Sequence, residues 1–196
     1  MPTQLPDKKE LPVLAFATQK HFEQWLAKNF DKQDGLWLRF FKKDSGEKTI
    51  TYAQALDEAL CYGWIDGQLK KYDDKSYLQK FTPRRAKSVW SKRNIEHIER
   101  LTSLGKMRPP GIAMMEKAKA GGSWAAAYDS HSTMTVPEDF LKELEKDKKA
   151  KAFFESLNKT NKYAIVWRLQ TAKKPETKAG RMAAILEMLV KEQKFH

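Results

Sequence analysis

The order of apolar and polar residues over the first half of the chain predicts helices and strands in one folded unit. Residues 11–17 are mostly apolar and predict a strand that leads into the first helix. Thr18 can cap that helix, which runs to about Asn29 and carries aromatic and aliphatic residues along one side. Residues 36–43 follow a glycine and are rich in aromatics, so they predict a second strand.

A second helix and a hairpin are predicted next. Thr51 and Gln54 have the spacing of a capping box, and Gly63 is placed to end the helix that this box begins. Residues Trp64–Tyr72 and Ser76–Thr82 then predict two strands joined by a short polar turn. We expect the pair to form an antiparallel hairpin, with Trp64 packed beneath it.

Two further helices are predicted before the pattern changes. Ser91 can cap a helix that stops at Gly105, and a shorter helix after Pro109 stops at Gly121. Residues 124–133 are polar toward their end, which predicts a connector.

The pattern beyond this connector is wholly helical. Thr135 and Glu138 fit another capping box, and Pro175 suits the first turn of the last helix. The apolar residues that mark the first three helices are Phe140, Leu141, Leu144, Phe153, Phe154, Leu157, Tyr163, Val166 and Trp167. In the last helix, Met182, Ile185, Leu186 and Leu189 are expected to point inward. The chain therefore predicts an α+β fold: a small antiparallel sheet with flanking helices over residues 1–130, then a C-terminal helical module over residues 131–196.

Charge narrows the class of partner. The chain has 196 residues, 41% of them hydrophobic, which is enough for a real core. Its net charge is +12, and the stretch from Lys70 to Arg108 holds twelve basic and four acidic residues, so it contributes +8 of that total. Concentrated positive charge favours an anionic small molecule or nucleic acid as partner.

Other classes of protein are disfavoured. The single cysteine, Cys61, cannot form an intramolecular disulfide and fits a reducing compartment. No apolar run approaches the length of about 20 residues that a membrane span needs, and residues 11–17 contain Pro12 and follow mixed charges, unlike a signal peptide. Four scattered histidines and one cysteine have no ligand spacing, so no metal and no cofactor are expected. We expect a soluble cytoplasmic protein without a membrane partner.

The strongest candidate site is a basic loop that ends at the start of a predicted helix. Free N–H groups and the helix dipole attract anions to such a position. The candidate ligand-binding residues are Arg84, Arg85, Lys87, Ser88, Trp90, Ser91 and Asn94. We expect both arginines to be exposed and to clamp oxygens in pairs, with Trp90 covering the ligand. The alternative is a solvated loop in which Trp90 fills the core and Ser91 merely caps.

Two other residues could carry chemistry. Asp66 follows Trp64 and Ile65 at a predicted corner, where burial would raise its pKa and suit a general acid or base. The alternative is a structural corner in which Asp66 accepts backbone hydrogen bonds. Cys61 could be a nucleophile only with a nearby base, so a buried, inert thiol is the favoured interpretation.

Several motifs together resemble the YdeI/OmpD-associated, or bacteriocin-protection, family over nearly the whole chain. In the first part they are Gly35-Leu-Trp-Leu, Phe41-Lys-Lys, Ala59-Leu-Cys-Tyr-Gly-Trp-Ile-Asp-Gly67, Phe81-Thr-Pro-Arg-Arg85, Trp90-Ser91 with Asn94, and Gly105-Lys-Met107. In the second part they are Trp167, Ala172-Lys-Lys-Pro-Glu-Thr177 and Arg181. The resemblance implies a YjbR/CyaY-like N-terminal part and a C-terminal helical module. It implies no particular reaction.

Three functions compete on these observations. The first is a non-enzymatic module that binds an anionic ligand (a nucleotide, phosphate or nucleic acid) in a stress or bacteriocin-protection role. The second is a small-molecule enzyme that uses Asp66 with Arg84 and Arg85, which requires a pocket where these residues meet. The third is an adaptor that holds a protein partner through the C-terminal helices.

Overall fold

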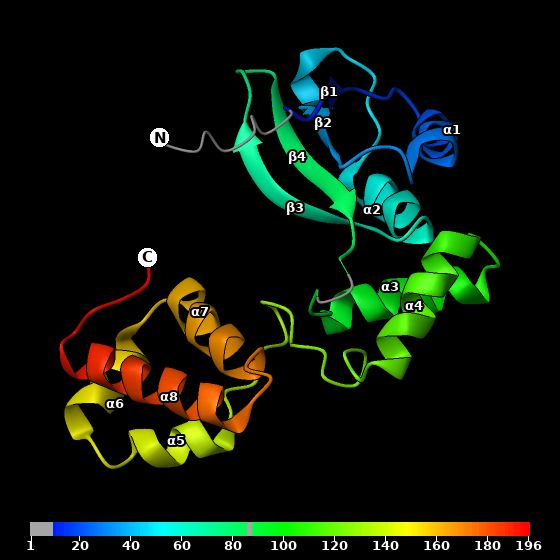
Figure 1. Ribbon diagram of the computed structural model, residues 1–196. Helices are drawn as coiled ribbons and strands as arrows, with labels where there is room; N and C mark the ends of the chain where they lie inside the picture. The colour runs from blue at the N-terminus through cyan, green and yellow to red at the C-terminus, as the bar shows by residue number, and fades with distance from the viewer. Residues whose placement is uncertain (1–9, 86–87) are drawn as a thin grey trace, which may run out of the picture. The chain divides into compact units, whose positions relative to one another are not determined.

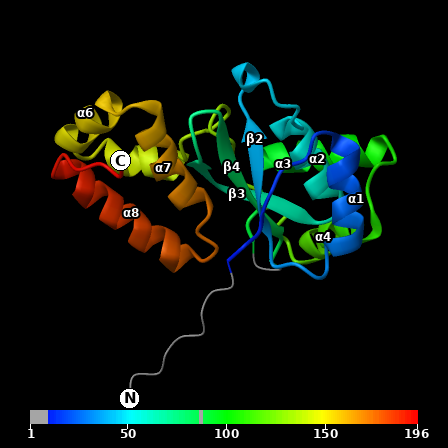
Figure 2. The same ribbon diagram turned by 90° about the horizontal axis from the view of Figure 1, so that it is seen from above.

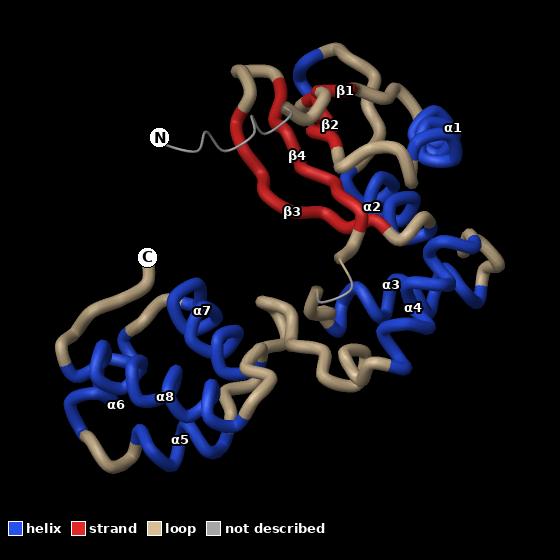
Figure 3. Tube along the Cα trace, viewed as in Figure 1, coloured by secondary structure: helices blue, strands red, loops and turns tan. Residues whose placement is uncertain are grey.

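The computed structural model describes residues 10–85 and 88–196. Their contacts divide the chain into two compact units. The first unit comprises Met1–Ser88 and His97–Ala120, and the second comprises Val89–Glu96 and Gly121–His196. All the named strands lie in the first unit, whereas the second is built of helices and loops (Figure 3). The predicted α+β class, with a C-terminal helical part, is confirmed; the boundary near residue 130 stays a prediction.

The sheet of the first unit has four strands in the order β1-β2-β4-β3. These strands are β1 (Val13–Leu14), β2 (Leu36–Phe41), β3 (Trp64–Lys71) and β4 (Ser76–Pro83). The predicted hairpin of β3 and β4 is confirmed, and β4 also pairs antiparallel with β2. The small sheet was predicted to be antiparallel; it is mixed, because β1 pairs parallel with β2. A helix connects these two strands, and such a crossover returns the chain in the same direction.

Helices cover one face of this sheet. Pairing places Leu36 beside Phe81, and Phe81 meets the ring of Phe22 at 6.0 Å between centroids. Phe22 belongs to α1 (Gln19–Asn29), which packs beside α2 (Tyr52–Cys61) on the same side of the sheet (Figures 1 and 2). The core of the unit therefore lies between the sheet and these two helices.

The predicted helix ends in the first unit are confirmed. The Thr18 hydroxyl accepts the His21 N–H at 3.3 Å, and Thr51 and Gln54 form the expected capping box before α2. Gly63 has a φ of 73°, a left-handed conformation that suits the residue after a helix. The other helices before residue 121 are η1 (Lys43–Ser45), α4 (Pro109–Ala120) and α3 (Lys92–Ser103), whose residues 92–96 belong to the second unit.

The second unit has its own apolar core. Its helices are α5 (Glu138–Leu144), α6 (Lys148–Ser156), α7 (Lys159–Gln170) and α8 (Pro175–Val190). The fully buried members of this core include Phe140, Ile165 and Leu189. Pro175 opens α8 as predicted. The capping box at Thr135 is wrong: α5 begins after Pro137, without a side-chain cap.

Candidate anion-binding site

A surface cavity of about 490 Å³ lies at the end of β4 in the first unit. Its lining residues are Leu11, Asp34, Lys80, Thr82, Pro83, Arg84 and Arg85. Three of these side chains are cationic and one is a carboxylate, so the lining has a formal charge of +2. The cavity brings the predicted arginine pair together with a lysine that the sequence analysis did not single out.

Close packing of backbone shapes this cavity. The Arg84 N–H donates to the Gly63 carbonyl at 2.9 Å, which holds the end of β4 against the turn after α2. Gly35 has a φ of 146°, and a Cβ there would lie 2.7 Å from the Phe81 carbonyl oxygen. Because only glycine allows this approach, Gly35 lets β2 begin directly beside the end of β4.

The two arginines differ in exposure. Arg85 is exposed, but Arg84 is only 6% exposed, so the expectation that both are exposed is wrong for Arg84. Arg84 follows directly after β4, where its backbone N–H is bonded to the Gly63 carbonyl. A buried guanidinium facing a cavity is a pre-ordered donor group, whereas Arg85 is free to reorient in solvent.

Of the next predicted ligand-binding residues, Ser88 belongs to the first unit and Trp90 to the second. Lys87 lies outside the described residues, and Ser88 is half-buried, with its N–H donating to the Arg85 carbonyl at 2.9 Å. Trp90 is 3% exposed and packs within the second unit against Trp124, at 5.1 Å between ring centroids. Ligand binding by these residues stays a prediction.

Ser91 and Asn94 stand at the start of α3 in the second unit. The Ser91 hydroxyl accepts the Asn94 N–H at 3.2 Å, so it caps the helix as predicted. Ser91 is 9% exposed, and its backbone also bridges to Tyr128. The Ser91 hydroxyl is therefore used within the fold, and Asn94 takes part in this cap through its backbone N–H.

Asp66 lies half-buried on β3, where it accepts a hydrogen bond from the Tyr52 hydroxyl at 2.8 Å. The hairpin register shifts between Asp66 and Leu69, which is a bulge at the predicted corner. Asp66 does not line the cavity that Arg84 and Arg85 share. An enzyme that uses Asp66 with Arg84 and Arg85 requires a pocket where the three side chains meet. This cavity does not provide such a pocket.

Cys61 is 2% exposed at the end of α2. Burial raises the pKa of its thiol to about 12, and the neighbouring carboxylates of Glu58 and Asp57 act in the same direction. The thiol therefore stays protonated at neutral pH and is a poor nucleophile. Across residues 10–85 and 88–196, no cluster of three or more His, Cys, Asp or Glu side chains could hold a metal ion.

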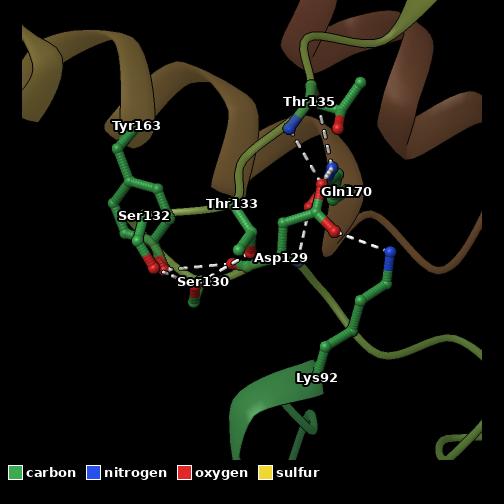
Figure 4. Close-up of polar contacts among 8 residues, drawn as sticks. All are labelled: Lys92, Asp129, Ser130, Ser132, Thr133, Thr135, Tyr163 and Gln170. Carbon is green, nitrogen blue, oxygen red and sulfur yellow. Dashed lines mark hydrogen bonds and ion pairs between the residues drawn. The ribbon is translucent and has the colours of Figure 1, made fainter.

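A polar network in the second unit was missed by the sequence analysis. Asp129 is 4% exposed and accepts hydrogen bonds from the Gln170 side chain at 2.8 Å and from the Thr135 N–H at 2.9 Å (Figure 4). It also pairs with the Lys92 ammonium at 2.6 Å. These contacts order the segment that was predicted to be a connector, and they use the Thr135 N–H that a capping box would need.

The ionisation of Asp129 should contribute to stability. Its burial opposes ionisation, but hydrogen bonds from Lys92, Gln170 and Thr135 outweigh burial and lower the pKa of the carboxyl. We expect Asp129→Asn to destabilise the protein by about 1–3 kcal/mol at neutral pH. A carboxyl whose pKa is lowered by folding stabilises the fold at pH values above its unfolded pKa. That contribution is lost as the pH falls through its folded pKa. The stability difference between wild type and Asp129→Asn should therefore shrink below about pH 4.

Urea unfolding of wild type and Asp129→Asn at several pH values measures this difference. Glu155→Gln, which changes an exposed carboxylate of α6, is the control and should change stability by less than about 0.5 kcal/mol. A deficit of equal size at acidic and neutral pH would show that the charge of Asp129 plays no part.

Comparison with known proteins defines the family. Residues 14–114 match the model of a domain of unknown function, DUF8412, and residues 133–192 match the model described as bacteriocin-protection, YdeI or OmpD-associated. Because the first match spans more than half of the chain, the protein belongs to the DUF8412 family. No curated protein and no solved structure matches it.

The second match confirms the expected family resemblance for the helical part, whereas the YjbR/CyaY-like nature of the first part is not confirmed. Of the helices in the described part of the chain, none is both long and apolar enough to cross a bilayer.

Proposed function

We propose that the first unit is a non-enzymatic module that binds an anionic, phosphate-bearing ligand in the cavity formed by Lys80, Arg84 and Arg85. The observation that carries the proposal is the meeting of these three cations in one cavity with a single carboxylate, Asp34. Clustered like charges repel one another, and a bound anion relieves that repulsion.

The chemistry of the three cations suits a phosphate group. A guanidinium offers two parallel N–H donors to phosphate oxygens, and a lysine adds a point charge. Arg84 is held in place by burial, while Arg85 and Lys80 are accessible enough to close on a ligand. A volume of about 490 Å³ is within the range of small-molecule sites.

A binding role is favoured over catalysis for this cavity. Asp66 does not line it, and the thiol of Cys61 is protonated and buried. A bacteriocin-protection role is part of the proposal, and it rests on the description of the family that residues 133–192 match.

Calorimetric titration with inorganic pyrophosphate tests the site. The test variant is Lys80→Ala with Arg85→Ala, which leaves the buried Arg84 in place. We expect it to bind pyrophosphate at least about tenfold more weakly than wild type, because a hydrogen bond to a charged group contributes about 1.5–3 kcal/mol. Affinity for wild type should also fall as sodium chloride rises.

The matched control is Lys28→Ala with Lys117→Ala, which removes the same charge from exposed positions of α1 and α4. It should bind pyrophosphate nearly as wild type does. If both double variants lose affinity equally, binding reflects net charge alone and the proposed site is wrong. Circular dichroism melting confirms that each variant is folded.

A further inference from the structure

The face of the sheet opposite α1 and α2 carries alternating aromatic and cationic side chains. Strand pairing sets Trp37 against Lys80 and Arg39 against Leu78, while Lys70 of β3 is also paired with Leu78. Directly paired residues project to the same face of a sheet. We call this surface, formed by Trp37, Arg39, Phe41, Lys70, Tyr72 and Lys80, the Trp37 face.

Contacts on the Trp37 face place cations over aromatic rings. The Lys70 ammonium lies 4.2 Å from the centre of the Trp37 ring, and that of Lys80 lies 5.9 Å from it. The Arg39 guanidinium lies 4.4 Å from the Phe41 ring and 4.9 Å from the Tyr72 ring. Cations held this way stay close to any ligand that stacks on the rings.

Exposure leaves this surface accessible to a ligand. Lys70 is exposed and Tyr72 is 51% exposed, while Trp37 and Phe41 are half-buried. Because Lys70 is a long exposed side chain, a base can replace its ammonium over Trp37 while the ammonium moves to a neighbouring phosphate.

We propose that the Trp37 face binds single-stranded nucleic acid, with bases stacked on its aromatic rings and phosphates held by its cations. This inference rests on the proposed function, because Lys80 belongs both to the Trp37 face and to the anion cavity. Proteins that bind single strands without strong sequence preference use aromatic surfaces beside a positively charged groove.

The length of the face favours a strand over one nucleotide. Trp37 and Phe41 are separated along β2 by about 13 Å, from the rise per residue of a strand. These two residues offer separate aromatic surfaces, with Arg39 between them. The Arg39 guanidinium is also paired with the Asp73 carboxylate at 2.7 Å. A duplex is disfavoured, because its bases are stacked on each other and cannot reach these rings.

Fluorescence anisotropy with a labelled oligothymidylate tests the inference on the full chain. We expect wild type to bind the single strand, and Trp37→Ala to bind it about fivefold or more weakly, because stacking contributes strongly to such complexes. Trp167→Ala is the matched control, since it removes a 36% exposed tryptophan of the second unit. It should bind as wild type does.

Pyrophosphate titration of the same variants separates this inference from the proposed function. Trp37→Ala should bind pyrophosphate with wild-type affinity, whereas the Lys80 and Arg85 double variant should lose affinity for both ligands. If wild type binds pyrophosphate but not the oligonucleotide, the inference is overturned and the anion site stands. If the oligonucleotide binds and Trp37→Ala has no effect, or if a duplex of the same length binds equally well, stacking is absent and the inference is also overturned.

Discussion

Gly111→Ala is expected to destabilise the first unit by about 2 kcal/mol or more, because it forces a side chain into a contact between two backbones. Gly111 lies in the first turn of α4, against the end of α2. A Cβ at this position would lie 2.2 Å from the Cys61 carbonyl oxygen and 2.8 Å from that of Leu60. Neither carbonyl can move away without disturbing α2, since both belong to its last turn.

Gly180→Ala is the matched control for this substitution. Gly180 lies within α8, and a Cβ there would meet no atom within 4 Å. Replacing a helical glycine at an open position should stabilise the protein by about 0.4–1 kcal/mol. Urea unfolding followed by circular dichroism compares the two. Equal effects of the two substitutions would contradict the close packing of α4 on α2.

Trp64→Ala should cost about 3–5 kcal/mol, the range for deleting a large buried aromatic side chain. Trp64 is 1% exposed, and its ring meets that of Trp25 edge-on at 5.8 Å between centroids. Its indole N–H also donates to the Phe30 carbonyl at 3.0 Å. The side chain therefore joins the start of β3 to the end of α1. Urea unfolding at neutral pH measures the loss.

Trp64→Phe separates packing from hydrogen bonding. Phenylalanine keeps much of the apolar contact but leaves the Phe30 carbonyl without the indole donor, so its cost should be about 1–3 kcal/mol. A loss as large as that of Trp64→Ala would mean that the hydrogen bond, rather than packing, is the dominant contribution. No loss in either variant would contradict the burial of Trp64.

The local elements of the first unit could be predicted from short stretches of sequence. The caps at Thr18 and Thr51, the helix end at Gly63 and the hairpin that begins at Trp64 depend on residues within a few positions of one another. These signals are a side-chain hydrogen bond, a backbone angle that glycine permits, or a regular spacing of apolar residues. Each of them depends on residues close together in the sequence. The cap predicted at Thr135 is wrong because a residue outside the local capping pattern takes part. The Thr135 N–H donates to the carboxylate of Asp129, six residues away, instead of to the Glu138 side chain.

The candidate site could be predicted only in part. Charge density and the Arg84-Arg85 pair pointed to a segment that lines this cavity, because charge is visible in the sequence. The partnership with Lys80 depends on the path of β4, and the placement of Trp90 in the second unit depends on its contact with Trp124. The contact of Trp90 leaves no periodic signal along the chain, whereas the four-residue spacing of Lys80 and Arg84 is one that places two side chains on the same face of a strand.

The sequence by itself determined the α+β class, the helical C-terminal part and the position of the basic segment, because these follow from local periodicity and composition. Tertiary structure alone decided the parallel pairing of β1, the burial of Arg84 and the network around Asp129. These features join residues far apart in the chain, and their free energy arises from desolvation and hydrogen bonds that exist only once the chain has folded.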